Sequence, residues 1–123
     1  MAAIRGKDTK PEMIVRQFLH GKGFRYRLHV KELPGKPDIV LPKYDAVVFV
    51  HGCFWHHHTN CKSARMPKSN SVFWRNKIMS NVTRDSLNVA RLESLGWRTI
   101  VVWECEVRDR LNHIVKEITN ENR

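Results

Sequence analysis

Apolar residues recur along the first half of the chain at helical spacing and then at strand spacing. Thr9-Lys10-Pro11-Glu12 has the form of a capping box, and the helical apolar stripe that follows ends at Gly21. Residues 24–30 alternate between apolar and basic or polar side chains, which predicts a half-exposed strand. After a Pro- and Gly-rich turn at 33–37, short apolar runs at 38–41 and 46–50 predict two more strands, the second suited to the centre of a sheet.

The second half of the chain begins with a segment that has no period. Residues 51–71 therefore predict a long structured loop, and loops of this length are usually functional. Helical spacing returns over 72–95, a buried strand follows at 98–103, and 107–118 carry an amphipathic stripe. The shared apolar face of the longer helix consists of Ile78, Val82, Val89 and Leu92. This order predicts an α/β fold in which helices flank a mixed central sheet, an antiparallel meander preceding a helical crossover to a parallel strand.

Length and charge narrow the class of protein. The 123 residues suit a single domain, 1–123, with one modest core. Because 22 Lys and Arg oppose 12 Asp and Glu, the formal net charge is +10, which indicates a polyanionic partner, first of all nucleic acid. An acidic membrane surface is the rival partner, but it would require a basic amphipathic helix, whereas here the charge is spread along the whole chain.

The chain also lacks the usual signals for membranes or secretion. No apolar run approaches the roughly 20 residues of a membrane span, so no membrane partner is expected. Residues 1–7 contain no apolar core of a secretory signal. Three cysteines cannot all pair within one chain, which favours a reducing compartment over a disulfide framework.

Four soft or borderline metal ligands are spaced so that they can meet. Three lie in the unperiodic loop and one follows the last strand: Cys53, His58, Cys61 and Cys105. Four such ligands predict a closed, structural Zn²⁺ site, a structural zinc loop. The alternative is ordinary buried thiols with solvated histidines, and His56 and His57 compete with His58 for the imidazole position.

A second group combines a carboxylate with imidazoles. Asp38 stands at the start of one predicted strand, His51 at the end of the next, and His56 shortly beyond it. Phosphodiester hydrolysis uses such groups, since a carboxylate holds Mg²⁺ and imidazoles move protons or order water. Taken singly, Asp38 is better explained by turn capping, and each histidine by a satisfied or solvated position. Together, on a basic domain, they favour a nuclease.

Two aromatic pairs lie in or directly after the loop at 51–71, among basic residues. Phe54-Trp55 and Phe73-Trp74 can stack on bases or wedge into a duplex. The alternative is packing in the core, which we expect for at least two of these four rings. Trp97 and Trp103, beside buried strand positions, are expected in the core, and Glu12 is explained as a member of the capping box.

Four segments together resemble a known enzyme family. They are LPGKPD at 33–38, FVHGCFWHHH at 49–58, GWR at 96–98 and VWEC at 102–105. The chain resembles the very-short-patch (Vsr) mismatch repair endonucleases from about residue 4 to residue 107. The resemblance implies a restriction-endonuclease-like core and Mg²⁺-dependent nicking of one DNA strand 5′ of the thymine in T:G mismatches, which arise by deamination of 5-methylcytosine.

The resemblance also implies roles for single residues. Asp38 and the backbone carbonyl of Val50 would hold catalytic Mg²⁺. The expected catalytic side chains are Asp38, His51, His56 and Glu12. The expected ligands of structural Zn²⁺ are Cys53, His58, Cys61 and Cys105. The expected DNA-intercalating side chains are Phe54, Trp55 and Trp74.

The sequence thus predicts a DNA mismatch endonuclease, with two alternatives. One is a restriction-like endonuclease on the same core, and the other is a non-catalytic zinc-bearing DNA-binding module. We expect a monomer that acts on double-stranded DNA with a T:G mismatch, together with mismatch-repair proteins. The expected location is the bacterial cytoplasm, in association with the nucleoid.

Overall fold

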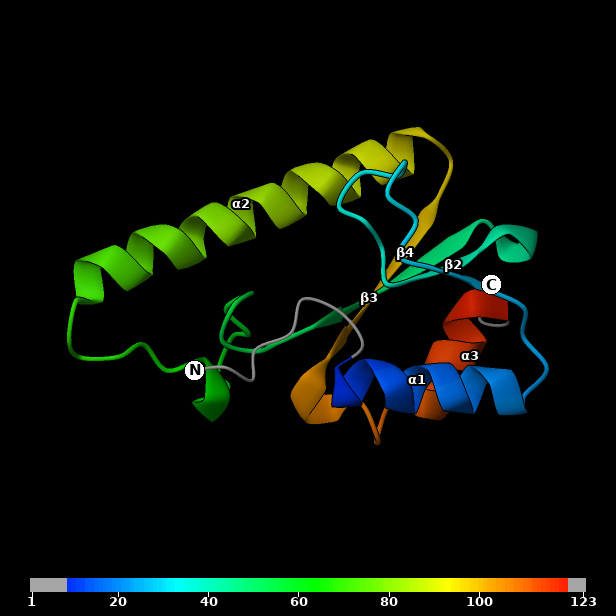
Figure 1. The fold of residues 1–123 in the computed structure, drawn as a ribbon, viewed down its shortest axis with the longest axis horizontal. Helices are drawn as coiled ribbons and strands as arrows, with labels where there is room; N and C mark the ends of the chain where they lie inside the picture. Colours follow the sequence, from blue (N-terminus) through cyan, green and yellow to red (C-terminus); the bar gives the residue numbers. More distant parts are fainter. Residues whose placement is uncertain (1–8, 120–123) are drawn as a thin grey trace.

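A computed structural model describes residues 9–119, and it begins with the predicted first helix, α1, Lys10–Gly21 (Figure 1). The Thr9 hydroxyl oxygen accepts a hydrogen bond from the Glu12 N–H at 3.4 Å, so the predicted helix start is confirmed. The capping box forms only by half. The Glu12 carboxylate bonds to Arg16 and His29 instead of returning to the N-terminus of the helix.

Four strands form one sheet in the predicted arrangement. Their order is β1 (Arg27–Leu28), β2 (Ile39–Leu41), β3 (Ala46–His51) and β4 (Arg98–Trp103). The first two pairings are antiparallel and the third is parallel, which confirms the meander followed by a crossover. In the parallel pair His51 lies opposite Trp103, so the two strands end together at the same edge of the sheet.

The first strand is much shorter than the predicted 24–30. Only Arg27–Leu28 pair with β2, and Leu28 is 39% exposed. The strand ends because His29 adopts a left-handed backbone conformation with φ 50°. Histidine is among the residues that enter this region more readily. The departure lets the His29 imidazole contact Glu12 on α1.

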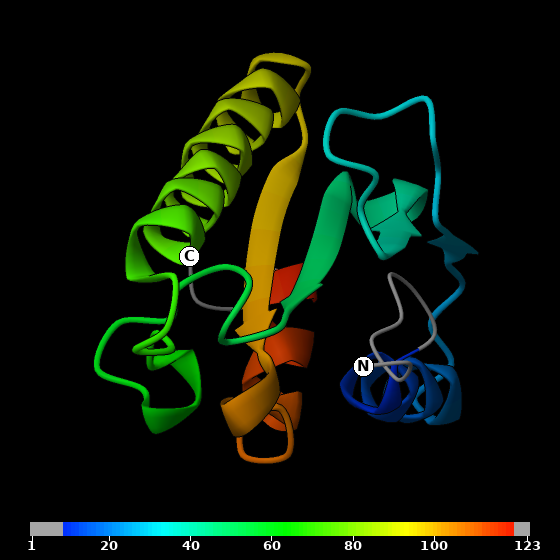
Figure 2. The same cartoon turned by 60° about the vertical axis from the view of Figure 1, so that its left-hand side comes forward.

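Three helices cover the two faces of the sheet. Figures 1 and 2 show α1 and α3 (Leu111–Thr119) on one face and the long α2 (Ser71–Ser94) across the other. Alternate residues of β3 point to the two layers, because Val48 packs with α1 and α3 while Val47 packs with Leu92 of α2. This double burial explains why the strand is apolar without interruption.

The remaining boundaries follow the predictions with one clear shift. Helix α2 lies within a residue of the predicted 72–95, but α3 starts at Leu111 rather than at residue 107. A short 3-10 helix, η3 (Glu104–Glu106), follows β4, and Val107 is buried before the helix begins. Within residues 9–119 no helix is both long and apolar enough to cross a bilayer. The expectation about residues 1–7 lies outside the described residues.

Candidate functional site

The parallel strands β3 and β4 bring two distant segments of the chain together. The loop that begins after His51 and the 3-10 helix η3 leave the sheet at the same edge. A second short 3-10 helix, η2 (Lys62–Ala64), lies in the same loop. The loop is attached to α2 by the Asn81 side-chain amide, which donates to the Trp55 carbonyl oxygen at 3.1 Å. The edge of the sheet therefore collects side chains from the loop, η3 and α2.

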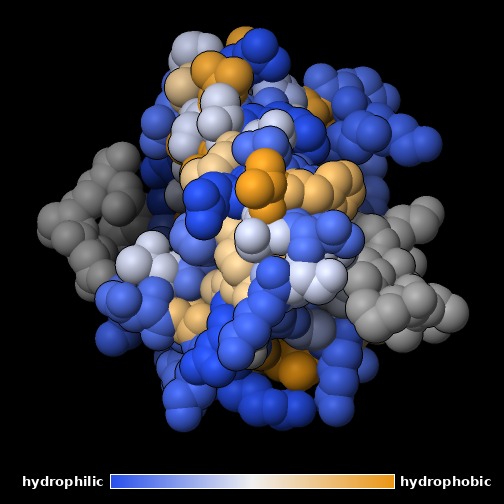
Figure 3. Space-filling model, turned by 90° about the vertical axis from the view of Figure 1, so that its left-hand side faces the viewer, coloured by the Kyte–Doolittle hydropathy of each residue, from blue (hydrophilic) through white to orange (hydrophobic). Residues whose placement is uncertain are grey.

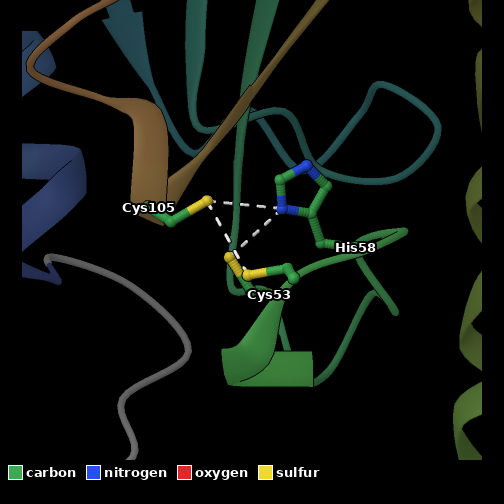
Figure 4. Close-up of side chains that lie close together, drawn as sticks. Cys53, His58 and Cys105 are labelled. Carbon is green, nitrogen blue, oxygen red and sulfur yellow. Dashed lines mark hydrogen bonds between the residues drawn. The ribbon is translucent and has the colours of Figure 1, made fainter. Parts of the chain in front are cut away.

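The first cluster at this edge contains all four predicted soft ligands: Cys53, His58, Cys61 and Cys105. Figure 4 shows the side chains of Cys53, His58 and Cys105 pointing toward one another. The His58 Nδ1 atom lies 3.6 Å from the Cys53 sulfur and 3.4 Å from the Cys105 sulfur. The sulfurs of Cys61 and Cys105 are 3.8 Å apart.

These spacings match those of ligands around a single tetrahedral ion. With Zn–S bonds of about 2.3 Å and Zn–N bonds of about 2.0–2.1 Å, two sulfurs lie about 3.8 Å apart and sulfur and nitrogen about 3.6 Å apart. The two histidines that competed for the imidazole position, His56 and His57, are not members of the cluster. The four residues thus form a possible metal-binding cluster.

Neighbouring groups orient the ligands of this cluster. The Cys53 N–H donates to the Glu104 carboxylate at 3.0 Å, and His58 Nε2 lies 3.7 Å from the Glu106 carboxylate. A carboxylate beside Nε2 leaves Nδ1 as the ligand atom. Burial raises the pKa of the Cys53 thiol to about 12, so a nearby cation is needed to favour the thiolate.

The second cluster joins the two predicted catalytic histidines to α2. The rings of His51 and His56 are stacked, with centroids 3.8 Å apart and planes inclined by 4°. The His56 Nδ1 atom lies 2.5 Å from the Asp85 Oδ2 atom. His51 is 8% exposed, and its buried Nδ1 atom has no hydrogen-bond partner in the described part of the chain. Burial, followed by the neighbouring His56, lowers the pKa of His51 to about 4, although Asp85 acts in the opposite direction. His51 is therefore neutral at pH 7.

Asp38, which directly precedes β2, lines the same cleft. Its Oδ2 atom accepts a hydrogen bond from the Val50 N–H at 2.7 Å. The N–H and C=O of one residue in an extended strand point to the same side, so the Val50 carbonyl also faces this region. Burial and the nearby Glu12 carboxylate raise the pKa of Asp38 to about 7, whereas the Val50 N–H lowers it. The cleft has a volume of about 270 Å³, and its lining includes Lys36, Asp38, Val50, His51, His56 and Asp85.

Glu12 on α1 lies close to Asp38. The Glu12 side chain is only 3% exposed, and its Oε2 atom lies 2.6 Å from an Arg16 nitrogen and 3.0 Å from the His29 Nε2 atom. Ligand atoms of Glu12, His29 and Asp38 all lie within 4.8 Å of one another. The structure thus brings together every predicted catalytic side chain, in two adjoining groups that meet at Asp38.

Trp103 lies between the two clusters, and its predicted place in the core is wrong. Its ring stacks on His58 with centroids 4.3 Å apart and meets His51 edge-on at 5.2 Å. It is half-buried and belongs to neither buried core cluster. Trp97, in contrast, packs against the core under α2 as predicted. Trp103 therefore lies between the Cys/His cluster and His51 of the second cluster.

The two predicted aromatic pairs, Phe54-Trp55 in the loop and Phe73-Trp74 on α2, form one cluster of rings. Trp74, at the start of α2, lies 5.6 Å from Phe54, 6.0 Å from Trp55 and 5.2 Å from Phe73, measured between ring centroids. Phe73 is 58% exposed and the other three are half-buried. Figure 3 faces this end of the molecule and shows apolar side chains surrounded by hydrophilic ones. The expectation that at least two of these rings pack in the core is wrong, because neither buried cluster includes any of them.

Three residues of the site were missed in the sequence: Arg16, His29 and Asp85. A signal existed for Asp85, because it follows Val82 by three residues and precedes Val89 by four, and so interrupts the apolar stripe of the helix with a carboxylate. No comparable signal existed for His29, since its left-handed backbone cannot be recognised from the alternating pattern around it.

Comparisons with known proteins show which sequences the chain is similar to. The family of the DNA mismatch endonuclease Vsr matches residues 1–63. The chain is 52% identical over 124 residues to the type II nicking enzyme V.NmeAIP of Neisseria meningitidis serogroup A. The match covers 96% of this chain and 88% of that protein. It is 50% identical over 109 residues to the type II nicking enzyme V.XorIIP of Xanthomonas oryzae, covering 89% of this chain and 79% of the relative. It is 44% identical over 110 residues to the DNA mismatch endonuclease Vsr of Escherichia coli, covering 89% of this chain and 70% of the relative.

Proposed function

Because the chain belongs to the Vsr family of DNA mismatch endonucleases, we propose that it nicks one DNA strand 5′ of the thymine in a T:G mismatch with the help of Mg²⁺. The observation that supports this most is the cleft. Asp38, His51 and His56 are far apart in the sequence but line one space of about 270 Å³. Lys36 at its mouth and the net charge of +10 suit a phosphodiester backbone.

Oxygen donors at the Asp38 end of the cleft fit Mg²⁺. The Asp38 carboxylate and the Val50 carbonyl would hold the ion, with Glu12 as an acidic neighbour. When bound, the ion supplies a polarised water and offsets the charge that builds up on the scissile phosphate. Asp38 then has to be ionised, which a cation favours over the proton that burial otherwise favours.

His56 is placed to move a proton in this reaction. Its Nδ1 atom is held by Asp85, which fixes Nδ1 as the protonated nitrogen and leaves Nε2 as the acceptor. His51 is neutral at pH 7 because of its lowered pKa and stacks on His56. We assign proton transfer to His56 Nε2, and to His51 the ordering of water beside it.

The Cys/His cluster would hold structural Zn²⁺. Four protein ligands at tetrahedral spacing leave no open position for a substrate, as in closed structural sites. Binding would fix the loop from Cys53 to Cys61 onto Cys105 after β4. The four-stranded mixed sheet with helices on both faces suits a restriction-endonuclease-like core, and we propose that the chain works as one domain and as a monomer.

The aromatic cluster would read the mismatch by stacking. A mismatched base pair costs less to unstack, so Phe54, Trp55 and Trp74 would wedge more readily at that step. Exposed Phe73 widens the same surface. The aromatic cluster and the cleft are neighbours along the chain, since Trp55 directly precedes His56.

A nicking assay tests the proposal against both alternatives. We expect Mg²⁺-dependent cleavage of one strand in a T:G duplex and no cleavage of the T:A control with the same flanking sequence. Equal cleavage of both duplexes would indicate a restriction-like endonuclease. Binding without cleavage, in protein that retains its zinc, would indicate a DNA-binding module.

A further inference from the structure

The group of Glu12, His29 and Asp38 differs from an ordinary magnesium site because it contains a nitrogen. The three side chains come from α1, from the residue after β1 and from the residue before β2, and their ligand atoms all lie within 4.8 Å of one another. Mg²⁺ prefers an all-oxygen environment, whereas imidazole suits first-row transition ions. Among these, Mn²⁺ is the ion that also suits carboxylate and water ligands, so it fits a site of two carboxylates and one imidazole better than Mg²⁺ does. One imidazole between two carboxylates therefore shifts the preference of the site.

Arg16 already places a positive charge at this position. One of its guanidinium nitrogens lies 2.6 Å from Glu12 Oε2 and 3.0 Å from His29 Nε2, so it contacts two of the three possible ligand atoms. His29 Nε2 also lies 3.0 Å from Glu12 Oε2. The single Nε2 atom cannot both accept from Arg16 and donate to Glu12, so the three groups compete. A divalent cation would satisfy Glu12 and His29 together and would have to displace the guanidinium.

We propose that His29 is a nitrogen ligand of the cation site at Asp38, that this ligand makes the site prefer Mn²⁺ to Mg²⁺, and that Arg16 competes with the ion for the position. This inference rests on the proposed function only in placing the cation at Asp38. Removing the imidazole nitrogen should lower the preference for Mn²⁺. Removing the guanidinium should strengthen the binding of either ion, because a positive charge opposes both.

A second group on α3 provides matched controls. His113 Nε2 and an Arg110 nitrogen contact the Glu117 carboxylate at 2.6 Å and 3.3 Å, so the same three residue types meet there. All three side chains are at least 32% exposed. This group is not among the possible metal sites of the described residues. Substitutions at Arg110 and His113 thus change the same charges without touching the cleft.

The test measures the binding of Mn²⁺ to the zinc-loaded protein in the absence of DNA. Electron paramagnetic resonance detects the bound Mn²⁺, and Mg²⁺ is added as a competitor. The parent should bind Mn²⁺ about tenfold more tightly than Mg²⁺, and its pulsed spectrum should show coupling to imidazole ¹⁴N. His29→Gln, which replaces the nitrogen with an amide oxygen, should lose that coupling and reduce the Mn²⁺ preference about tenfold. Arg16→Met should increase the affinity for both Mn²⁺ and Mg²⁺. The controls Arg110→Met and His113→Gln should leave both affinities unchanged.

Several results would overturn the inference. These are a parent spectrum without ¹⁴N coupling, an unchanged Mn²⁺ preference in His29→Gln, or weaker binding in Arg16→Met. The parent spectrum needs no variant, so a misfolded variant does not prevent the test. Since binding is measured without DNA, an absence of nicking in a protein with nitrogen-ligated Mn²⁺ contradicts the proposed function alone. Normal Mg²⁺-dependent nicking without a nitrogen ligand contradicts this inference alone.

Discussion

The Cys/His cluster and the cleft lined by Asp38, His51 and His56 lie on either side of Trp103, yet their side chains are arranged in different ways. In the cluster, donor atoms converge on one point at tetrahedral spacing. In the cleft, Asp38 is bonded to Val50 and His56 to Asp85, and a space of about 270 Å³ remains between them. Convergent donors suit an ion that stabilises the fold, while separated and individually supported donors leave room for a substrate.

One loop contributes residues to both regions, and the cleft depends on the Cys/His cluster more than the cluster depends on the cleft. His51 and His56 belong to the cleft, and Cys53 and His58 to the cluster, so the two sets alternate along the chain. The turns that fold the loop join His56 N–H to the Gly52 carbonyl at 3.1 Å and His58 N–H to the Cys53 carbonyl at 3.0 Å. Disrupting the cluster should therefore displace His56, whereas changes in the cleft should leave the cluster intact.

The largest effect is expected from Cys105→Ser, which removes a ligand of the cluster. Structural Zn²⁺ contributes on the order of 10 kcal/mol in zinc-finger peptides, so the variant should lose zinc and its Tm should fall by roughly 10 °C or more. Nicking should fail as well, because the loop holds His56. Elemental analysis and thermal unfolding measure this, with exposed His57→Ala in the same loop as control. Full zinc content and an unchanged Tm would show that the four-ligand assignment is wrong.

Asp38→Asn should separate the two regions most cleanly. The amide keeps the shape and can still accept from the Val50 N–H, but it lacks the charge that would hold the cation. We expect nicking to fall on the order of 10³-fold while zinc content, Tm and DNA binding persist. Asp45→Asn, at an exposed position with φ 51°, is the control for losing a carboxylate. Nicking at the parent rate would place the cation elsewhere.

Asp85→Asn should have a smaller effect on the rate because it acts through His56. An amide is uncharged and can either accept from or donate to Nδ1, so it no longer fixes which nitrogen of His56 carries the proton, and single-turnover nicking should slow on the order of 10²-fold. Additional Mg²⁺ should not restore the rate of nicking. The exposed Asp109→Asn serves as control. Rescue by high Mg²⁺ would mean that Asp85 acts on the cation rather than on His56.

The smallest effect is expected from Trp74→Ala, which tests the surface beyond both regions. Loss of one stacking ring costs about 1–3 kcal/mol of binding, so the preference for T:G over T:A duplexes should fall about tenfold. Competition binding at fixed salt measures the ratio, with Leu87→Ala, 52% exposed on the same helix, as control. If both duplexes bind equally less well and the Tm falls, Trp74 is structural.

The sequence predicted the elements whose signals are local and missed the contacts that depend on how they pack. The α2 helix and the β3–β4 pair follow from periodicity, because burial imposes it. The Cys/His cluster was also predictable, since few residue types bind soft ions. The length of β1 was not, because its end depends on the backbone of His29. The Asp85–His56 contact joins residues 29 positions apart and required the packing of α2 against the loop.

Helix α2 connects the aromatic cluster to the cleft as a single rigid element. Trp74 and Asp85 are eleven residues apart on it, which corresponds to about 16 Å along the helix axis. In the proposed reaction, Trp74 near the start of this helix contacts the mismatch, and Asp85 in its second half holds the histidine that acts at the phosphate. The separation of Trp74 and Asp85 along α2 then contributes to where the cut falls relative to the mismatch. Inserting one residue between the two would also turn the ends by about 100° relative to each other.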